Sequence, residues 1–556
     1  MSRIVSRRKF LRGAQVGAAF ALGGSLGAFA PGSRPLLATA GERLGPAAVP
    51  SAPAVAPQMD MGPFVPDAEI SLSATEKWVQ ILPGSQTRVW GYEGQLLSGS
   101  GATVEAIPGS YLGPIIRVQS GTKLRLHLHN NLPEETVLHP HGLRVPEDAD
   151  GQPMQAFGPG ETKVYEFQVI DPACPAWFHP HPHMRTAYQV AMGLAGLFYV
   201  TDPVEAAAVP GAGTGANDIP LVIQDRTFDA SNQFLYQPHH LWGYLGDRIL
   251  VNGQPDASLS LEPRAYRLRV LNGSNARTFK LAWSNGMPLQ VIGTDGGLLP
   301  AVAQRSYVTL MPGERADLWA DFTALARKQV VLQSQSFDPG GGMMGGGGGG
   351  GGGMGGGGRH GGGGGGMGGD GMGSALPNGA AFNILTVNVG RKATTKPVLG
   401  PLPALPVRWD ASNVANFSQP VPFTLDMYMM TWYINGRLYE MMAVAEDEMV
   451  YKDVPIAWEW INNGPIPHPM HIHNVQFQVV GRTPTSALSS YATVNQGFVD
   501  SGWKDTVTVW PGERVKIAMN FGPHTGMYMY HCHILEHEDM GMMRNLMIMD
   551  PTMPGM

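Results

Sequence analysis

The chain has 556 residues, 43% hydrophobic and 15% charged, which is typical of a compact, β-rich globular protein long enough for about three domains. The formal net charge is −6, and without the basic first 40 residues the chain carries 32 basic against 44 acidic residues. An acidic body of this kind argues against a nucleic-acid-binding surface.

The first 40 residues are predicted to be an export signal. A twin arginine, Arg7 and Arg8, opens "RRKFLRGAQVGAAF" and leads into a mild Ala- and Gly-rich stretch. The pattern is typical of a twin-arginine signal, with cleavage after Ala30 or Ala40. An uncleaved anchor is the alternative, although the stretch is short and weakly apolar for a membrane span, and no other segment could cross a bilayer. We therefore expect export in the folded state, to the periplasm or the extracellular space.

A Pro- and Ala-rich lead at residues 41–66 is followed by short alternating apolar runs such as "TKLRLHLHNNLP" and "YRLRVLNGS". These runs predict strands of several β-sandwiches. Three copies of Pro-Gly-Glu followed by a strand, "GPGETKVYEFQV", "MPGERADLWADF" and "WPGERVKIAMNF", indicate one related element in each of three domains. The predicted domains cover residues 60–205, 215–335 and 390–556.

Residues 338–374 form a glycine-rich segment between the second and third predicted domains. Glycine runs cannot offset the entropy of ordering their backbone, so the sequence predicts a disordered linker. Its five methionines, His360 and Asp370 are compatible with loose binding of soft copper ions, and a passive tether is the equal alternative.

Ten of the 17 histidines fall into four short motifs, none of them in the middle domain. The motifs are "HPHG" (His139, His141), "WFHPH" (His179, His181), "HPMHIH" (His468, His471, His473) and "HCHILEH" (His531, His533, His537). Residues i and i+2 of a strand point to the same face, so each His-x-His pair aims two imidazoles at one place. Four such pairs predict metal binding.

The motif "HCH" separates two predicted centres. On a strand, His531 and His533 face one way and Cys532 the other, so the cysteine binds a different metal from its neighbours. One cysteine, two histidines and a weak axial methionine form the ligand set of a blue-copper site, here Cys532, His468, His537 and Met542. The eight remaining motif histidines are enough for a three-copper cluster between the first and third domains.

Together with "GTDGGLLP", "GWKDTV" and "HCHILEHEDMGMM", these motifs resemble the multicopper oxidases, closest to the bacterial three-domain laccases and copper-efflux oxidases. The resemblance implies an all-β fold of three cupredoxin-like Greek-key β-sandwich domains and four copper ions. The implied ligands are His139 and His471 for type 2 copper; His141, His179 and His533 for one type 3 copper; His181, His473 and His531 for the other; and His468, Cys532, His537 and Met542 for type 1 copper.

The family chemistry implied is one-electron oxidation of a donor coupled to reduction of O2 to water. Asp150 matches the acid that the family places beside the cluster, and Glu538 is a second candidate for handling protons; for both, a solvated loop acid is the alternative. Asp505 is predicted either to orient a type 1 histidine or to form an ordinary salt bridge.

Several residues compete with these assignments. His183 has the spacing to replace His179, but the family match favours His179 and His181. We interpret His127 and His129 as plain strand residues. We expect three further histidines to be surface or structural residues: His239, His240 and His524. Cys174 is expected to be a buried small hydrophobe.

The electron donor is predicted to be a phenolic or other small reductant, with Cu(I) as the close alternative. Of the 30 methionines, 17 lie at or beyond Met427, which favours copper handling unless they simply fill the core. Copper-efflux oxidases carry an Asp and a Met before the type 1 motif, where this chain has Gly464 and Ile466. A non-catalytic copper-binding or scaffold protein is the alternative from another class.

Overall fold

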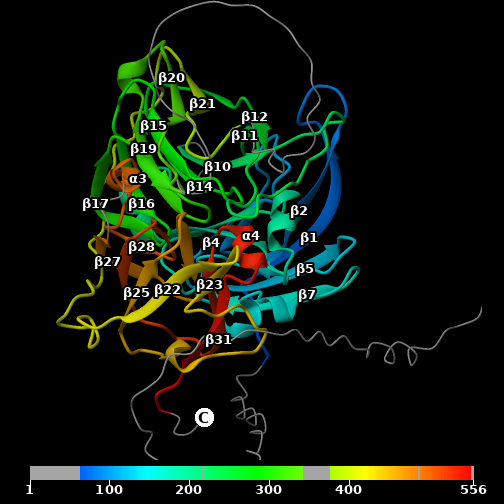
Figure 1. The fold of residues 1–556 in the computed structure, drawn as a ribbon. Coiled ribbons are helices and arrows are strands. Elements are labelled where there is room, and N and C mark those ends of the chain that lie inside the picture. The colour runs from blue at the N-terminus through cyan, green and yellow to red at the C-terminus, as the bar shows by residue number, and fades with distance from the viewer. Residues whose placement is uncertain (1–62, 214–216, 342–375, 486–488, 553–556) are drawn as a thin grey trace, which may run out of the picture. The chain divides into compact units, whose positions relative to one another are not determined.

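The computed structural model describes residues 63–213, 217–341, 376–485 and 489–552. The predicted export signal, most of the Pro- and Ala-rich lead and residues 342–374 of the predicted linker lie outside the described residues, so those predictions stay predictions. Within the described residues, the strands form six sheets, two from each of three successive stretches of the chain (Figure 1).

The first stretch forms one sheet in the order β2-β1-β5-β7 and another in the order β3-β4-β9-β8-β6. Its strands are β1 Ala68–Val79, β2 Thr87–Gly99, β3 Ala102–Glu105, β4 Ile115–Gln119, β5 Lys123–Asn131, β6 Leu138–His139, β7 Thr162–Gln168, β8 Cys174–Pro180 and β9 Gly196–Thr201. Alternation sets the buried faces: Leu124, Leu126 and Leu128 of β5 are buried, while the residues between them face outward.

The middle stretch forms sheets in the orders β12-β11-β10-β14-β19-β16-β17 and β13-β21-β20-β15-β18. Its strands are β10 Asp218–Arg226, β11 Arg248–Val251, β12 Gln254–Pro255, β13 Ser258–Leu261, β14 Ala265–Asn272, β15 Phe279–Trp283, β16 Leu289–Thr294, β17 Gly297–Arg305, β18 Val308–Leu310, β19 Arg315–Asp321, β20 Gln329–Ser334 and β21 Phe382–Val389. β21 pairs with β20 and β13. The middle sheets therefore include a strand beyond residue 335, where the sequence predicted none.

The third stretch forms sheets in the orders β23-β22-β25-β30-β27-β28 and β24-β32-β31-β26-β29. Its strands are β22 Val421–Tyr428, β23 Thr431–Ile434, β24 Met449–Tyr451, β25 Ile456–Asn462, β26 His468–Ile472, β27 Phe477–Pro484, β28 Trp503–Lys504, β29 Thr506–Val509, β30 Glu513–Met519, β31 Gly526–Cys532 and β32 Met543–Met549. β31 lies between β26 and β32, which brings the "HCH" and "HPMHIH" motifs onto adjacent strands.

Helices are short. The α-helices are α1 Thr186–Ala191, α2 Pro203–Ala208, α3 Ser489–Ala492 and α4 Leu535–Asp539, and single 3-10 turns occupy Glu147–Ala149, Pro153–Gln155, Thr323–Leu325, Glu446–Glu448 and Asn495–Gly497. No helix among the residues described has the length and apolar character needed to cross a membrane. The predicted all-β, multi-domain fold class is confirmed.

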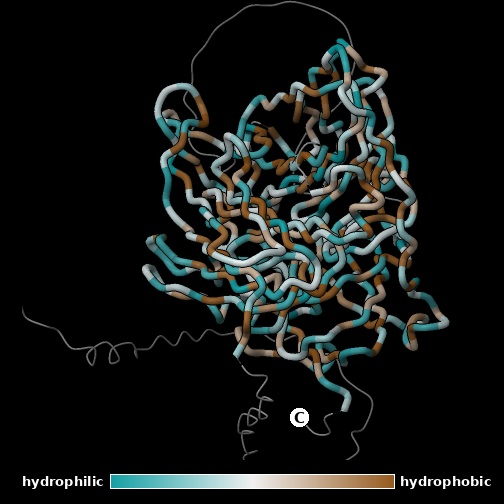
Figure 2. Tube along the Cα trace, turned by 180° about the vertical axis from the view of Figure 1, so that it is seen from behind, coloured by the Kyte–Doolittle hydropathy of each residue, from teal (hydrophilic) through white to brown (hydrophobic). Residues whose placement is uncertain are grey.

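Three large hydrophobic cores correspond to the three pairs of sheets. Figure 2 shows hydrophobic and hydrophilic residues alternating along the inner strands, with hydrophilic residues frequent in the projecting loops. The third core contains Cys532 and Met542 together with Trp432, Trp458 and Trp460, all 0% exposed. Side chains in a closely packed core of this kind have little free space around them. The predicted limits of the three domains stay a prediction.

Candidate metal centre

Cys532 lies at the centre of one group of possible metal ligands. Its Sγ is 3.4 Å from Nδ1 of His468, the first residue of β26, and 3.7 Å from Nδ1 of His537 on α4. All three residues are 0% exposed. The chain leaves β31 at Cys532, turns through Ile534 and returns His537 on the short helix α4, so two of the three donors come from one tight turn.

Hydrogen bonds and ring packing set the orientation of this first group. His537 Nε2 donates to the carbonyl of Leu241 at 3.0 Å, which leaves Nδ1 free to face the sulfur. Trp432 packs against the rings of His468 and His537, with both centroid distances 4.7 Å. The backbone NH of Cys532 donates to the Met542 carbonyl at 3.1 Å, and the NH of Met542 donates to the His537 carbonyl at 2.8 Å. Met542 therefore belongs to the same turn.

Eight histidines form a second group where the first and third stretches of the chain meet. All are at most 1% exposed. Ring nitrogens approach one another at 3.4 Å between His139 Nε2 and His471 Nε2, 3.4 Å between His141 Nδ1 and His179 Nε2, 3.3 Å between His181 Nε2 and His531 Nε2, and 3.2 Å between His473 Nε2 and His531 Nε2. Uncharged imidazoles whose nitrogens converge in this way form a metal-ligand set.

His533 completes the second group. Its ring centroid is 4.9 Å from that of His141 and 5.3 Å from that of His179, and neither of its nitrogens has a hydrogen-bond partner. The structure thus gathers the eight predicted cluster histidines in one place and Cys532 with His468 and His537 in another, so that Cys532 and its two neighbours lie in different groups.

Backbone carbonyls fix several of these rings. Nδ1 of His139 donates to the Asp150 carbonyl at 2.7 Å, Nδ1 of His471 to the Asp505 carbonyl at 2.9 Å, and Nδ1 of His179 to the Pro180 carbonyl at 2.9 Å. In each ring the other nitrogen keeps its lone pair and points into the cluster. Such partners determine tautomer and orientation in metal sites.

The electrostatics keep the donors ready for a metal ion. Burial lowers the pKa of His179, His471 and His537 to about 3 and that of His531 to about 4, so these rings are neutral at pH 7. Burial raises the pKa of the Cys532 thiol, so a bound cation is needed to ionise it. Buried nitrogens without partners, neutral imidazoles and one thiol fit copper, a metal that binds thiolate and imidazole ligands.

Two predicted carboxyl groups lie against the cluster histidines. Asp150 Oδ2 accepts from His473 Nδ1 at 2.8 Å. Glu538 places Oε1 3.4 Å from His181 Nδ1 and Oε2 3.3 Å from His531 Nδ1. Both carboxyls are buried, which raises their pKa. The alternative of a solvated loop acid is therefore wrong for both residues.

Asp505 requires a correction. The prediction that it orients a type 1 histidine is wrong: its side chain contacts His141, a cluster histidine, and its two oxygens accept from Arg315. Its salt-bridge alternative is confirmed. The partner of His537, a predicted type 1 ligand, is instead the carbonyl of Leu241. Every residue type has a backbone carbonyl, so the sequence gives no signal for an acceptor of this kind.

The competing residues lie elsewhere. His183 is exposed and packs on Tyr439 with ring centroids 5.3 Å apart. His127 and His129 lie on β5 and bond to Glu69 and Thr162. His239 and His240 are exposed and His524 is half-buried. Cys174 is buried and forms no disulfide.

Comparisons with known proteins agree with the predicted resemblance to the multicopper oxidases. Multicopper oxidase family models match residues 73–205 and 415–552. The chain is 31% identical to a laccase of Bacillus stratosphericus, over 78% of this chain and 89% of the relative. It is 30% identical to the multicopper oxidase mco of Staphylococcus haemolyticus, over 79% of this chain and 83% of the relative. The crystal structure of the McoA multicopper oxidase of Aquifex aeolicus is similar with a TM-score of 0.69 and 30% identity, covering 87% of this chain and 97% of that chain.

Proposed function

Since the chain belongs to the multicopper oxidase family, we propose that it oxidises a small reductant one electron at a time at a type 1 copper and reduces O2 to two waters at a three-copper cluster. The observation that carries this proposal is the placement of Cys532 and its neighbours. The thiol faces His468 and His537, while His531 and His533 face the cluster. A covalent path of one residue therefore joins the two groups.

The proposed copper ligands are the grouped histidines and Cys532, with Met542, whose backbone bonds to Cys532 and His537, as the axial ligand of type 1. They are His468, Cys532, His537 and Met542 for type 1; His139 and His471 for type 2; His141, His179 and His533 for one type 3 ion; and His181, His473 and His531 for the other. When bound, the four copper ions supply the change of oxidation state that the side chains do not provide. Relatives named laccase and multicopper oxidase indicate an oxidoreductase, which leaves the non-catalytic scaffold without support.

Asp150 and Glu538 are proposed to hold the protons that the reduction of O2 consumes. Asp150 accepts from His473 Nδ1, and Glu538 Oε1 lies 3.4 Å from His181 Nδ1. Each carboxyl also has one oxygen without a hydrogen-bond partner, Oδ1 of Asp150 and Oε2 of Glu538. Because burial favours the neutral acid, each group can carry a proton at neutral pH beside the place where it is needed.

A phenolic or similar small reductant is the proposed donor. The imidazoles of His468 and His537 are both 0% exposed, so a donor acts through the cover that Leu241 provides over His537. A side chain at Gly464 would begin 3.5 Å from His468 Nε2, the place where copper-efflux oxidases carry an acid. The absence of that acid favours the laccase-type donor over Cu(I).

Cu(I) oxidation in copper tolerance is the second candidate. Four methionines of the third stretch are markedly exposed, namely Met429 at 80%, Met442 at 68%, Met449 at 44% and Met441 at 39%. Thioethers are soft ligands suited to Cu(I), and exposed methionines are not needed for the core.

The cellular setting is proposed from the sequence. The twin arginine supports export of the folded protein to the periplasm or the extracellular space. The division into a signal at 1–40, three cupredoxin domains and a glycine-rich linker at 338–374 belongs to the same proposal.

Oxygen uptake by the copper-loaded protein tests the proposed function. Cu(I) and 2,6-dimethoxyphenol are supplied in parallel while the blue thiolate absorption is recorded. A blue protein that turns over the phenol faster supports the laccase assignment, and faster turnover of Cu(I) replaces it with the second candidate. A colourless protein without oxygen uptake overturns both.

A further inference from the structure

A buried arginine of the middle stretch ends beside the histidine cluster. Arg315, the first residue of β19, is 1% exposed. Its Nη1 donates to Asp505 Oδ1 and its Nη2 to Asp505 Oδ2, both at 2.6 Å. Two parallel hydrogen bonds between planar groups fix the orientation of a carboxylate as well as balancing its charge.

The paired carboxylate contacts histidines from two different stretches of the chain. Asp505 Oδ1 lies 3.1 Å from His141 Nε2, and the Asp505 carbonyl accepts from His471 Nδ1 at 2.9 Å. The rings of His141 and His471 stack with centroids 3.7 Å apart and planes 11° apart. Asp505 therefore holds both rings, and Arg315 is one residue removed from each.

The surroundings leave the ion pair no room to move. A Cβ at Gly142, next to His141 and at a φ of 91°, would lie 2.6 Å from Arg315 Nη2 and 2.7 Å from Asp505 Oδ2. Arg315 Nε also donates to the carbonyl of Pro175 at 3.0 Å, on the strand that carries His179. The guanidinium thus connects β19 with both stretches that supply cluster ligands.

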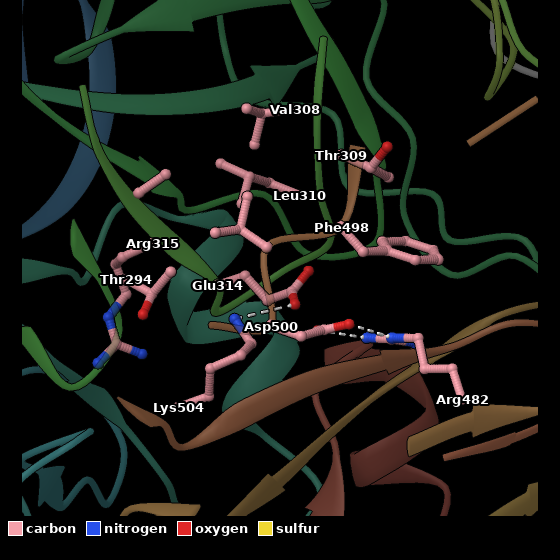
Figure 3. Close-up of a pocket in the computed structure, with 12 residues that line it drawn as sticks. Thr294, Val308, Thr309, Leu310, Glu314, Arg315, Arg482, Phe498, Asp500 and Lys504 are labelled. Atoms are coloured by element: carbon pink, nitrogen blue, oxygen red, sulfur yellow. Dashed lines mark hydrogen bonds and ion pairs between the residues drawn. The ribbon is translucent and has the colours of Figure 1, made fainter. Parts of the chain in front are cut away.

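Three consecutive residues of the middle stretch reach the cluster region. Gly313 lies against the His533 ring, since a Cβ there would be 2.9 Å from His533 Cδ2. Glu314 Oε1 is 3.4 Å from Lys504 Nζ, and Arg315 pairs with the next residue, Asp505. Figure 3 shows Glu314 extending toward Lys504 and the guanidinium of Arg315 pointing away from that pair.

Stability alone does not account for this arrangement. Removing two charges from water is costly, and apolar residues of the same volume often stabilise a core as well or better. The two hydrogen bonds from Arg315 hold the Asp505 carboxylate in place 3.1 Å from His141 Nε2. The pair therefore maintains a charged acceptor next to two histidines.

We propose that Arg315 is a positioning residue of the copper cluster: by orienting the Asp505 carboxylate it sets the ring plane of His141 and, through the stacking of the two rings, that of His471, so that a stretch to which no copper ligand is assigned governs the type 2 site. The inference rests on the proposed function. It assigns the middle pair of sheets a role beyond joining the other two.

The test compares Arg315→Leu, Arg315→Lys and Asp505→Asn with a control, Arg267→Leu. Arg267 on β14 is equally buried and pairs with Asp317 and Glu205, and none of its described bonds reaches a histidine. Copper per chain, the type 2 electron paramagnetic resonance signal and the blue type 1 absorption are measured, with chelator competition for affinity. Thermal unfolding of the copper-free protein reports structural damage separately.

We expect the type 2 copper of Arg315→Leu and Asp505→Asn to be held about 10- to 100-fold more weakly, with an altered type 2 signal and unchanged blue absorption. Arg315→Lys, which keeps the charge without the planar fork, is expected to bind copper with an altered signal. Arg267→Leu is expected to lose stability and keep the native type 2 signal. If Arg315→Leu does not fold, Arg315→Lys and Asp505→Asn decide.

Native type 2 signals and affinities in the folded variants at residues 315 and 505 would overturn the inference, as would an equal loss in Arg267→Leu. Failure of the proposed function looks different, because the wild-type protein would then lack the type 2 signal and the blue absorption.

Discussion

Substituting Gly313 by alanine tests the contact between the middle stretch and the cluster. Gly313 has a φ of 84°, a region in which a side chain costs about 1–2 kcal/mol. The new Cβ would also stand 2.9, 3.0 and 3.2 Å from three atoms of the His533 ring. Contacts this short force the ring to shift, and overpacking of this kind costs about 1–3 kcal/mol more.

The corresponding turn of the first Pro-Gly-Glu motif provides a matched control. Gly160 occupies the same place in the first Pro-Gly-Glu motif, with a φ of 79°, and its Cβ would meet nothing within 4 Å. Gly160→Ala therefore carries the backbone cost alone. The difference between the two variants isolates the contact with His533.

Chemical denaturation of the copper-free variants and copper content per chain measure this difference. Gly313→Ala is expected to lose about 1–3 kcal/mol more stability than Gly160→Ala. Because each 1.4 kcal/mol corresponds to tenfold in affinity, the displaced His533 ring is also expected to weaken copper binding about 5- to 150-fold. Equal stability and equal copper content in the two variants would refute the account of this turn.

Three further predictions concern protons, acid stability and the donor. Asp150→Asn and Glu538→Gln are expected to slow oxygen uptake about 100-fold or more, because each removes a carboxyl that carries a proton. The blue absorption should stay, because the type 1 ligands are unchanged. Equal uptake by the wild type and the variants would contradict the role of these carboxyls in proton transfer. Three arginines outweigh the effect of burial and lower the pKa of Asp218 to about 2 from its ordinary 3.8, so its stabilising charge is present above pH 4 and is lost as the pH falls toward 2. Copper-free wild-type protein should therefore lose about 2 kcal/mol more than Asp218→Asn over that interval, measured by denaturation at each pH, and parallel pH profiles would show that Asp218 does not titrate this way. If Cu(I) is the donor, replacing Met429 and Met442 together by serine should lower Cu(I) turnover and leave 2,6-dimethoxyphenol turnover intact. Equal Cu(I) turnover by the wild type and this variant would exclude the two methionines as Cu(I)-binding groups.

The grouping of the candidate ligands was predictable because metal binding constrains residue type and strand spacing together. Alternation on a strand correctly separated Cys532 from His531 and His533. His127 and His129 were interpreted as ordinary strand residues because the predicted ligand set was already full, and in the structure they lie on β5 and bond to Glu69 and Thr162. Local pattern was sufficient in these cases.

Partners between distant strands were not predictable. The contacts of Asp505 with Arg315 and of His537 with the Leu241 carbonyl join residues far apart in sequence, and the first was wrongly assigned to a type 1 histidine. The second Pro-Gly-Glu motif was the available signal: the motif was recognised as a repeat, but not as the turn that carries Arg315. β21 was missed because the glycine-rich segment separates it from the sheet that it joins.

The central claim is that Cys532 belongs to one copper site while its two neighbours belong to another. Copper content and visible absorption of the wild-type protein and Cys532→Ser, measured side by side, test it most directly. The account predicts a blue wild-type protein with four copper ions per chain and a colourless variant that keeps three. A variant that stays blue, or one that loses all four ions while remaining folded, would contradict it.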